Sequence, residues 1–392
     1  MFIHRSRRRA FTLVELLVTM AVLTILVGMV TAALASVNSD ARRARCETQL
    51  TAINAMLQAR LETYLTQRIR VNPTPPYQHF LPYSARARML LVRDQMRMEL
   101  PDRKNDLMFG PVSVQSYVQT RRGAATTRED FTAPDHQQLM YRRIIARFRG
   151  NALTPTTWHL GWTEQNEASE CLYLILAATT VGGKSGLEIV RKDQIGDTDG
   201  DLVPEILDPW GVPIAWIRWP AGYWLTYALR NEWNGATAAD RTAAIQAKKQ
   251  ILGEDQFDML YVDWRNFDRN TSATGDDDST DDTFNMPPLV VSAGPDGEFD
   301  LMLRSPGHGD PINFATMPSP AAPTPYATPY YYPDPYPRNY HGATDPSYGV
   351  DYIGDSDVFA STKTEGWLGA YYDANGNGYD ESADNIYSVR AQ

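Results

Sequence analysis

The sequence predicts an α+β protein: a long N-terminal helix packed on an antiparallel β-sheet head that carries large insertions. The first observation is an apolar run of 27 residues, Phe11 to Val37, whose only charged residue is Glu15. This run exceeds the ~20 apolar residues that cross a bilayer core as a helix. The second observation is an apolar stripe that continues the helical period beyond the run.

The apolar run follows a short basic segment with four arginines, Arg5, Arg7, Arg8 and Arg9. Positive charge beside a membrane span stays on the cytoplasmic side, so the N-terminus is predicted to be cytoplasmic and the bulk of the chain to be exported. A cleaved secretory signal is the alternative, but its apolar region is about 7–15 residues long. The longer run favours a retained single-pass anchor.

Glu15 is the unusual residue of this segment. A carboxylate in hydrocarbon is unfavourable by several kcal/mol unless it is neutralised or paired, so such a residue is treated as functional. One alternative is that Glu15 lies close enough to the membrane interface to stay hydrated. Another is that a peptidase cuts between Ala10 and Phe11, which would place a new amino group four residues from Glu15.

The helix is predicted to continue beyond the membrane as an amphipathic stem. Its apolar residues recur every three or four positions, which is the spacing of one helix face, and they are Leu50, Ile53, Leu57, Leu61 and Tyr64. The prolines at 73, 75 and 76 prevent the helix from continuing. The predicted organisation is therefore a leader at 1–10, a membrane helix at 11–37, a stem at 38–70 and an enlarged head at 71–392.

Charge is distributed unevenly along the chain. Residues 1–150 contain 23 Lys and Arg against 11 Asp and Glu, whereas residues 151–392 contain 14 against 36. Clustered cations are needed to bind phosphate, so we expect no nucleic-acid partner for the acidic part. Dense carboxylates instead suit hard divalent cations. The two cysteines, Cys46 and Cys171, allow one disulfide, but the sequence leaves their pairing open.

The head contains predicted helices and two biased loops. The helices are expected near 84–100, 166–181 and 236–252, with an acidic loop at 271–285 and a Pro/Tyr-rich loop at 311–340. The Pro/Tyr-rich loop is either a loop along the surface or a recognition strip. The stretch "GGKSG" at 182–186 is interpreted as a turn, because a phosphate-binding loop would require glycine where Ala178 stands.

Two acidic stretches have oxygen-bearing residues at the spacing of a twelve-residue calcium loop. The stronger candidate, at 373–384, supplies Asp373, Asn375, Asn377, Tyr379 through its carbonyl, Asp380 and Asp384. The weaker candidate, at 197–208, supplies Asp197, Asp199, Asp201, Glu205 and Asp208. Leu202 replaces the glycine expected at position 6 of the weaker window. The alternative for both is that Asp, Asn and Gly simply form turns.

The N-terminal stretch "AFTLVELLVTMAVLTILVGMV" resembles the class III signal of type IV pilins and type II secretion pseudopilins. In that family a prepilin peptidase removes a basic leader before Phe, and the new N-terminus is methylated. The resemblance implies cleavage between Ala10 and Phe11, insertion in the inner membrane and a head in the periplasm or outside the cell. It also implies that Glu15 pairs with the Phe11 amine of a neighbouring pilin-like subunit. Ala10 departs from the glycine that usually precedes the cut.

Three stretches of the head are similar to the major pseudopilin of type II secretion, in the same order: "DPWGVPIAWIRWPAG" (208–222), "VVSAGPDGEFD" (290–300) and "DNIYS" (384–388). This similarity implies strands near 213–219, 223–229, 288–293 and 385–390, and a closing acidic loop that binds calcium.

The predicted function is that of a structural, non-enzymatic subunit of a type II secretion or type IV pilus-like filament. One alternative is a calcium-dependent binding module at a filament tip, with the Pro/Tyr-rich loop as its contact surface. Another is a signal-anchored periplasmic enzyme. Against the enzyme, none of the six histidines belongs to an H-E-x-x-H pair, and no G-x-S-x-G motif occurs.

Overall fold

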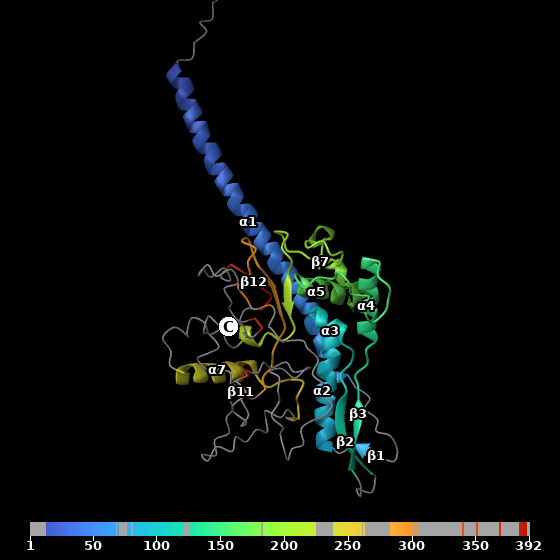
Figure 1. The fold of residues 1–392 in the computed structure, drawn as a ribbon. Helices are drawn as coiled ribbons and strands as arrows, with labels where there is room; N and C mark the ends of the chain where they lie inside the picture. The colour runs from blue at the N-terminus through green and yellow to red at the C-terminus, as the bar shows by residue number, and fades with distance from the viewer. Residues whose placement is uncertain are drawn as a thin grey trace, which may run out of the picture.

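Figure 1 shows one long helix with the head packed on its C-terminal half. The computed structural model describes residues 13–67, 69, 77–79, 81–120, 126–181, 183–224, 238–260, 262, 283–301, 303, 339–340, 350–351, 368–369 and 384–389.

Helix α1 spans Leu13–Thr66, 54 residues, which corresponds to a length of ~80 Å. Its N-terminal half projects away from the head (Figure 1). Burial begins at Cys46 and follows the predicted stripe, because Leu50, Ile53, Leu57 and Tyr64 are buried and Leu61 packs against the same core. The predicted amphipathic stem is thereby confirmed, and the helix ends before the prolines.

A three-stranded antiparallel sheet lies against α1. Its order is β12-β9-β8, formed by Ile386–Tyr387, Leu289–Ser292 and Ala215–Ile217. These strands lie within three of the four ranges predicted by resemblance. In the fourth range, 223–229, the described residues Tyr223 and Trp224 are helical and not extended. Pro220 explains the difference, because proline lacks the N–H that a strand donates but is favoured at the start of a helical turn.

The helices of the head are α2 (Leu81–Glu99), α3 (Lys104–Met108), α4 (His136–Arg149), α5 (Glu167–Ala178) and α7 (Ala238–Leu252). Three of them, α2, α5 and α7, coincide with the predicted helices. The remaining 3₁₀ turns are η1 (Gly186–Glu188) and η2 (Lys192–Gln194).

A second antiparallel sheet was not predicted. Its order is β1-β2-β3, with bounds Tyr77–His79, Val114–Thr120 and Thr126–Phe131. Three short hairpins complete the described strands: β4 (Thr180–Val181) with β5 (Lys184–Ser185), β6 (Ile195–Gly196) with β7 (Glu205–Ile206), and β10 (Asn339–Tyr340) with β11 (Val350–Asp351). The β4-β5 hairpin confirms the turn interpretation of "GGKSG".

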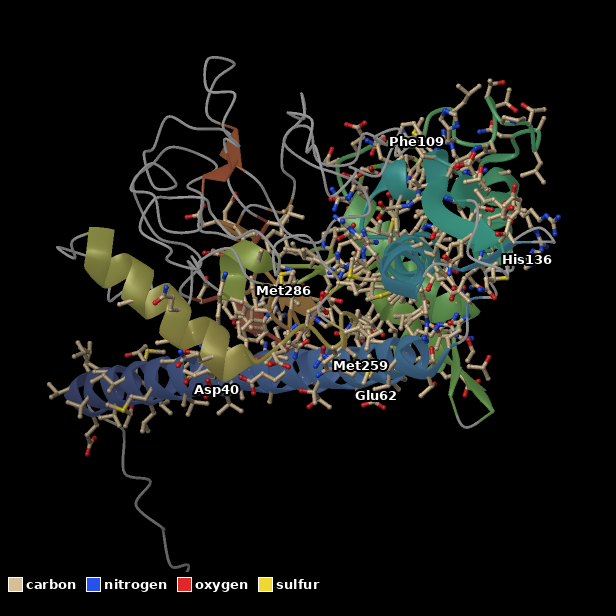
Figure 2. All side chains as sticks on the ribbon, turned by 90° about the horizontal axis from the view of Figure 1, so that it is seen from below. Asp40, Glu62, Phe109, His136, Met259 and Met286 are labelled. Atoms are coloured by element: carbon tan, nitrogen blue, oxygen red, sulfur yellow. The ribbon has the colours of Figure 1, made fainter. Side chains whose placement is uncertain are left out.

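The main core forms where α1 meets α2, α5 and the three-stranded sheet. Leu50 of α1 shares this cluster with Met96 of α2, Ile175 of α5 and Trp216 of β8. Figure 2 shows the head lying along α1 between the labelled positions Asp40 and Glu62. The stem half of α1 is therefore the central element of the head's core.

Both cysteines are buried and free. Cys46 belongs to the cluster around α1, and Cys171 belongs to a separate cluster with Tyr141 and Trp158. Burial raises the pKa of Cys46 to about 11, so the thiol stays protonated at neutral pH. A protonated, buried thiol is a structural and not a reactive cysteine.

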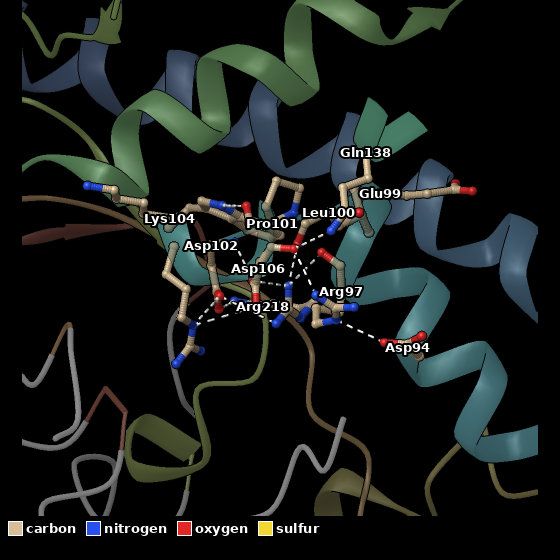
Figure 3. A network of polar contacts seen from close by, with 12 residues as sticks. Asp94, Arg97, Glu99, Leu100, Pro101, Asp102, Lys104, Asp106, Gln138 and Arg218 are labelled. Atoms are coloured by element: carbon tan, nitrogen blue, oxygen red, sulfur yellow. Dashed lines mark hydrogen bonds and ion pairs between the residues drawn. The ribbon is translucent and has the colours of Figure 1, made fainter. Parts of the chain in front are cut away.

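A buried network of charges joins α2 and α3 to the strand β8 (Figure 3). Arg218, next to β8, forms ion pairs with Asp102 and Asp106, and Arg97 pairs with Asp94 on α2. Their side chains are almost fully excluded from solvent. The network thus holds the basic first part of the head against the sheet that lies on α1.

Candidate functional site

The acidic window at 197–208 begins in the tight connection between β6 and β7. Strand pairing sets Gly196 opposite Glu205, so the loop between them reverses direction within a few residues. The carboxylate of Asp197 accepts hydrogen bonds from the backbone N–H groups of Gly200, Asp201 and Leu202 at 2.8, 3.1 and 3.0 Å. These bonds fix the loop in a sharp turn.

Leu202 occupies the left-handed backbone region, with a φ of 74°. The side chain is 55% exposed, so it contributes little packing in return for this conformation. A left-handed conformation is unfavourable for an L-residue by roughly 1–2 kcal/mol but not for glycine. The sequence placed Leu202 where a calcium loop normally has glycine, and the structure shows the backbone conformation that such a glycine adopts.

We therefore expect Leu202→Gly to raise the free energy of unfolding by about 1 kcal/mol, because it removes the left-handed penalty and little burial. Urea unfolding of the full chain in detergent would measure the change. Leu202→Ala is the matched control, since it removes the same side chain but keeps a Cβ in the strained backbone. Equal effects from the two substitutions would contradict the argument from strain.

A buried carboxylate from α5 points at this loop. Glu170 is 0% exposed, and its Oε2 accepts a 2.5 Å hydrogen bond from the indole N–H of Trp162. Oxygens of Glu170, Asp199 and Asp201 lie within 4.8 Å of one another. Burial, followed by the nearby charges of Asp201 and Asp199, raises the pKa of Glu170 to about 9.

Local hydrogen bonds hold α5 at this distance from the loop. Ser169 donates its hydroxyl to the carbonyl of Ile206 at 3.0 Å and accepts the Ile206 N–H at 3.0 Å. Asn166, which precedes α5, donates its side-chain amide to Glu205 at 2.7 Å. Glu170 comes from 27 residues upstream of Asp197, so no spacing rule within the acidic window predicts it.

The structure brings together four of the five residues predicted in this window. Asp197, Asp199 and Glu205 form one group of neighbouring carboxylates, and Asp201 joins Asp199 in the other. Asp208 instead folds its own turn: its Oδ1 accepts the N–H groups of Trp210 and Val212, and its Oδ2 accepts the hydroxyl of Ser292. Asp208 is therefore hydrogen-bonded to its own turn and to strand β9, and it does not belong to the acidic loop.

The stronger predicted calcium window, 373–384, lies outside the described residues except for Asp384. Asp384 adjoins Asp296 of the "SAGPDG" turn, and burial together with the charge of Asp296 raises the pKa of Asp384 to about 6. Its Oδ1 is buried without a hydrogen-bond partner among the described residues. The predicted ligands Asp373, Asn375, Asn377, Tyr379 and Asp380 stay predictions.

The N-terminal segment differs from the head because its apolar side chains face outward. Glu15 lies in the first turn of α1, and apolar residues from Leu13 to Val37 are at least half exposed. The helix contains a window long and apolar enough to cross a membrane, and none of that window is buried inside the protein. Ala10 and Phe11 lie outside the described residues.

A family model described as the prokaryotic N-terminal methylation motif matches residues 5–31. The chain carries the type IV pilin and pseudopilin signal. No curated protein and no solved structure matches the sequence. The match covers the four arginines, the predicted cut before Phe11, and Glu15, and it ends within the exposed half of α1. The acidic loop and Glu170 belong to the head, which the match does not reach.

Proposed function

We propose that this pilin-like precursor is a structural subunit of a type II secretion or type IV pilus-like filament. The observation that carries the proposal is the methylation signal at residues 5–31, which continues directly into an exposed apolar helix. The same helix becomes the core of the head from Cys46 onward. One continuous element thus serves first as a membrane anchor and then as the shaft that presents the head.

The exposed apolar half of α1 needs a nonaqueous environment in each stage of this proposal. Before assembly, the lipid of the inner membrane covers it, and the arginines keep the leader on the cytoplasmic side. In a filament, the α1 helices of neighbouring subunits cover it instead. A free Phe11 amine on one subunit would then neutralise the charge of Glu15 on the next, which makes its burial between apolar helices less unfavourable.

Processing tests the proposal most directly. We expect mass spectrometry of the membrane-extracted protein, from cells with an active prepilin peptidase, to show residues 1–10 missing and a methyl group on the Phe11 amine. Ala10→Gly should be processed at least as completely, because it supplies the residue that usually precedes the cut. An intact N-terminus at Met1 would exclude a processed filament subunit and favour an ordinary membrane anchor.

We also propose that the head binds calcium through the C-terminal loop at 373–384. The buried Oδ1 of Asp384 and the neighbouring carboxylate of Asp296 support the proposal, because both are oxygen ligands of the kind that calcium selects. A calcium-stabilised head at a filament tip is the second candidate function.

A further inference from the structure

The side chain of Glu170 is the least compensated acidic group of the cluster beside α5. It is 0% exposed, and its Oε1 has no hydrogen-bond partner among the described residues. Buried polar atoms in native proteins are almost always paired, and an unpaired carboxylate oxygen is especially unfavourable. An atom of this kind is paired either through a proton shared with a neighbouring acid or through a bound ligand.

The surroundings of Glu170 determine the chemistry of that ligand. Asp199 and Asp201 offer oxygens within 4.8 Å of it, and the second carboxylate group, containing Asp197 and Glu205, shares Asp199. The nearby side-chain cation is Arg149, whose Nη1 lies 3.8 Å from Asp201 Oδ1, longer than a hydrogen bond. Among the described residues, the four acids that accompany Glu170 lie near this one guanidinium, and the negative charge that they leave suits a cation.

We propose that Glu170, Asp199 and Asp201 bind a calcium ion between α5 and the β6-β7 loop. The three side chains offer only oxygen, which selects hard cations over the transition metals that prefer nitrogen or sulfur. Calcium fits better than magnesium because magnesium keeps several of its waters, whereas Glu170 and Asp201 are buried.

This ligand set differs from the one that sequence spacing suggests. The spacing rule nominated Asp208 as the ligand at position 12 of the loop. In the structure, Asp208 lies in neither group of neighbouring carboxylates, and its oxygens accept hydrogen bonds from the turn at 208–212 and from Ser292. Glu170 supplies a carboxylate from a neighbouring helix in its place, so the site joins two elements and not one loop.

The consequence of binding is a link between the acidic loop and the stem. Helix α5 carries Glu170 on one side and packs Leu172, Ile175 and Leu176 into the core cluster of α1 on another. A cation held by Glu170 and Asp199 therefore stabilises the position of α5 on the stem. Because calcium would bind only the folded arrangement, it raises the free energy of unfolding by RT ln(1 + [Ca²⁺]/Kd).

Isothermal titration calorimetry of the full chain in detergent micelles tests this site, with calcium chloride as the probe. We expect calcium to bind with a Kd of ~10⁻³ M or lower, which is the range of extracellular calcium sites. Glu170→Gln keeps an acceptor for the Trp162 indole but removes the charge. The variant should therefore bind one calcium ion fewer than the wild type, or bind that ion with a Kd at least tenfold higher. Asp193→Asn is the matched control, because Asp193 is an exposed acid four residues before the loop, with a side chain that is 64% exposed; it should bind as the wild type does.

Asp384→Asn separates this site from the C-terminal one, since it should leave the ion bound at Glu170 in place. If Glu170→Gln loses its native circular dichroism spectrum, Asp199→Asn serves as the second variant. The proposal would be overturned if the wild type, Glu170→Gln and Asp199→Asn bind calcium equally. A proton shared by Glu170 and Asp201 would then explain why these acids lie so close together. The inference does not rest on the filament role, because processing at Phe11 is measured separately.

Discussion

Replacing Arg218 by methionine is expected to lower the free energy of unfolding by about 3–5 kcal/mol, the usual result of breaking a buried ion pair on one side. Methionine keeps most of the apolar part of the arginine side chain, so the loss of stability comes chiefly from the missing charge. Arg218 Nη1 lies 2.8 Å from Asp106 Oδ2, and Arg218 Nη2 lies 3.4 Å from Asp102 Oδ1. Without the guanidinium, two buried carboxylates lose a neutralising partner. Denaturant unfolding in detergent measures the change.

The pKa of Asp102 shows how much this carboxylate depends on its cations. Burial alone would raise this pKa, but the charges of Arg103 and Arg218 outweigh burial and hold it below its ordinary range. Arg218 also donates to the carbonyl of Leu100 at 2.6 Å and lies over the ring of Trp219 at 4.3 Å from the ring centroid. Its replacement therefore leaves a backbone acceptor unpaired as well.

Arg191→Met is the matched control for this experiment. The Arg191–Asp193 ion pair has the same 2.8 Å separation as Arg218–Asp106, but its side chains are 63% and 64% exposed. Exposed pairs contribute roughly 0–1 kcal/mol, so the control should unfold almost as the wild type does. If both variants lose similar stability, burial does not decide how much an ion pair contributes to the free energy of unfolding. The conclusion that the buried ion pairs of Arg218 stabilise the head would then be wrong.

The sequence predicted those parts of the fold that depend on local pattern. The stem is one example, because the apolar stripe from Leu50 to Tyr64 has the helical period and this period alone decides which face is buried. The strands of the sheet β12-β9-β8 lie within ranges that the resemblance implied, because the motifs that carry the resemblance are also local in the sequence. The helical turn at Tyr223 was missed, since the resemblance implied a separate strand at 223–229 directly after Pro220.

The rest of the structure depends on residues that meet only after folding. Arg218 and Asp106 are separated by 112 positions, and no local pattern in the sequence pairs them. Glu170 likewise joins the acidic loop through the docking of α5. Asp208 shows the converse error, because a regular spacing of oxygens does not distinguish a ligand from a residue that caps its own turn.

Glu15→Val is expected to reduce incorporation into filaments by an order of magnitude or more. The substitution makes the membrane segment more apolar, so insertion and cleavage before Phe11 should proceed as in the wild type. In the proposed filament, the Phe11 amine of the neighbouring subunit would lose its counter-charge in a medium of low dielectric constant. That loss is unfavourable by several kcal/mol, and each 1.4 kcal/mol corresponds to a factor of ten. The measurement is the fraction of tagged subunit that sediments with sheared filaments when it is co-expressed with wild-type protein.

Thr19→Val is the matched control, because it introduces the same side chain one helical turn further along. The Thr19 hydroxyl donates to the carbonyl of Leu16 within the helix at 2.9 Å, so its loss removes a local bond and no charge. Normal incorporation of Thr19→Val together with failure of a fully processed Glu15→Val would locate the effect in the carboxylate. Equal incorporation of both variants would mean that Glu15 remains hydrated at the membrane interface and takes no part in assembly.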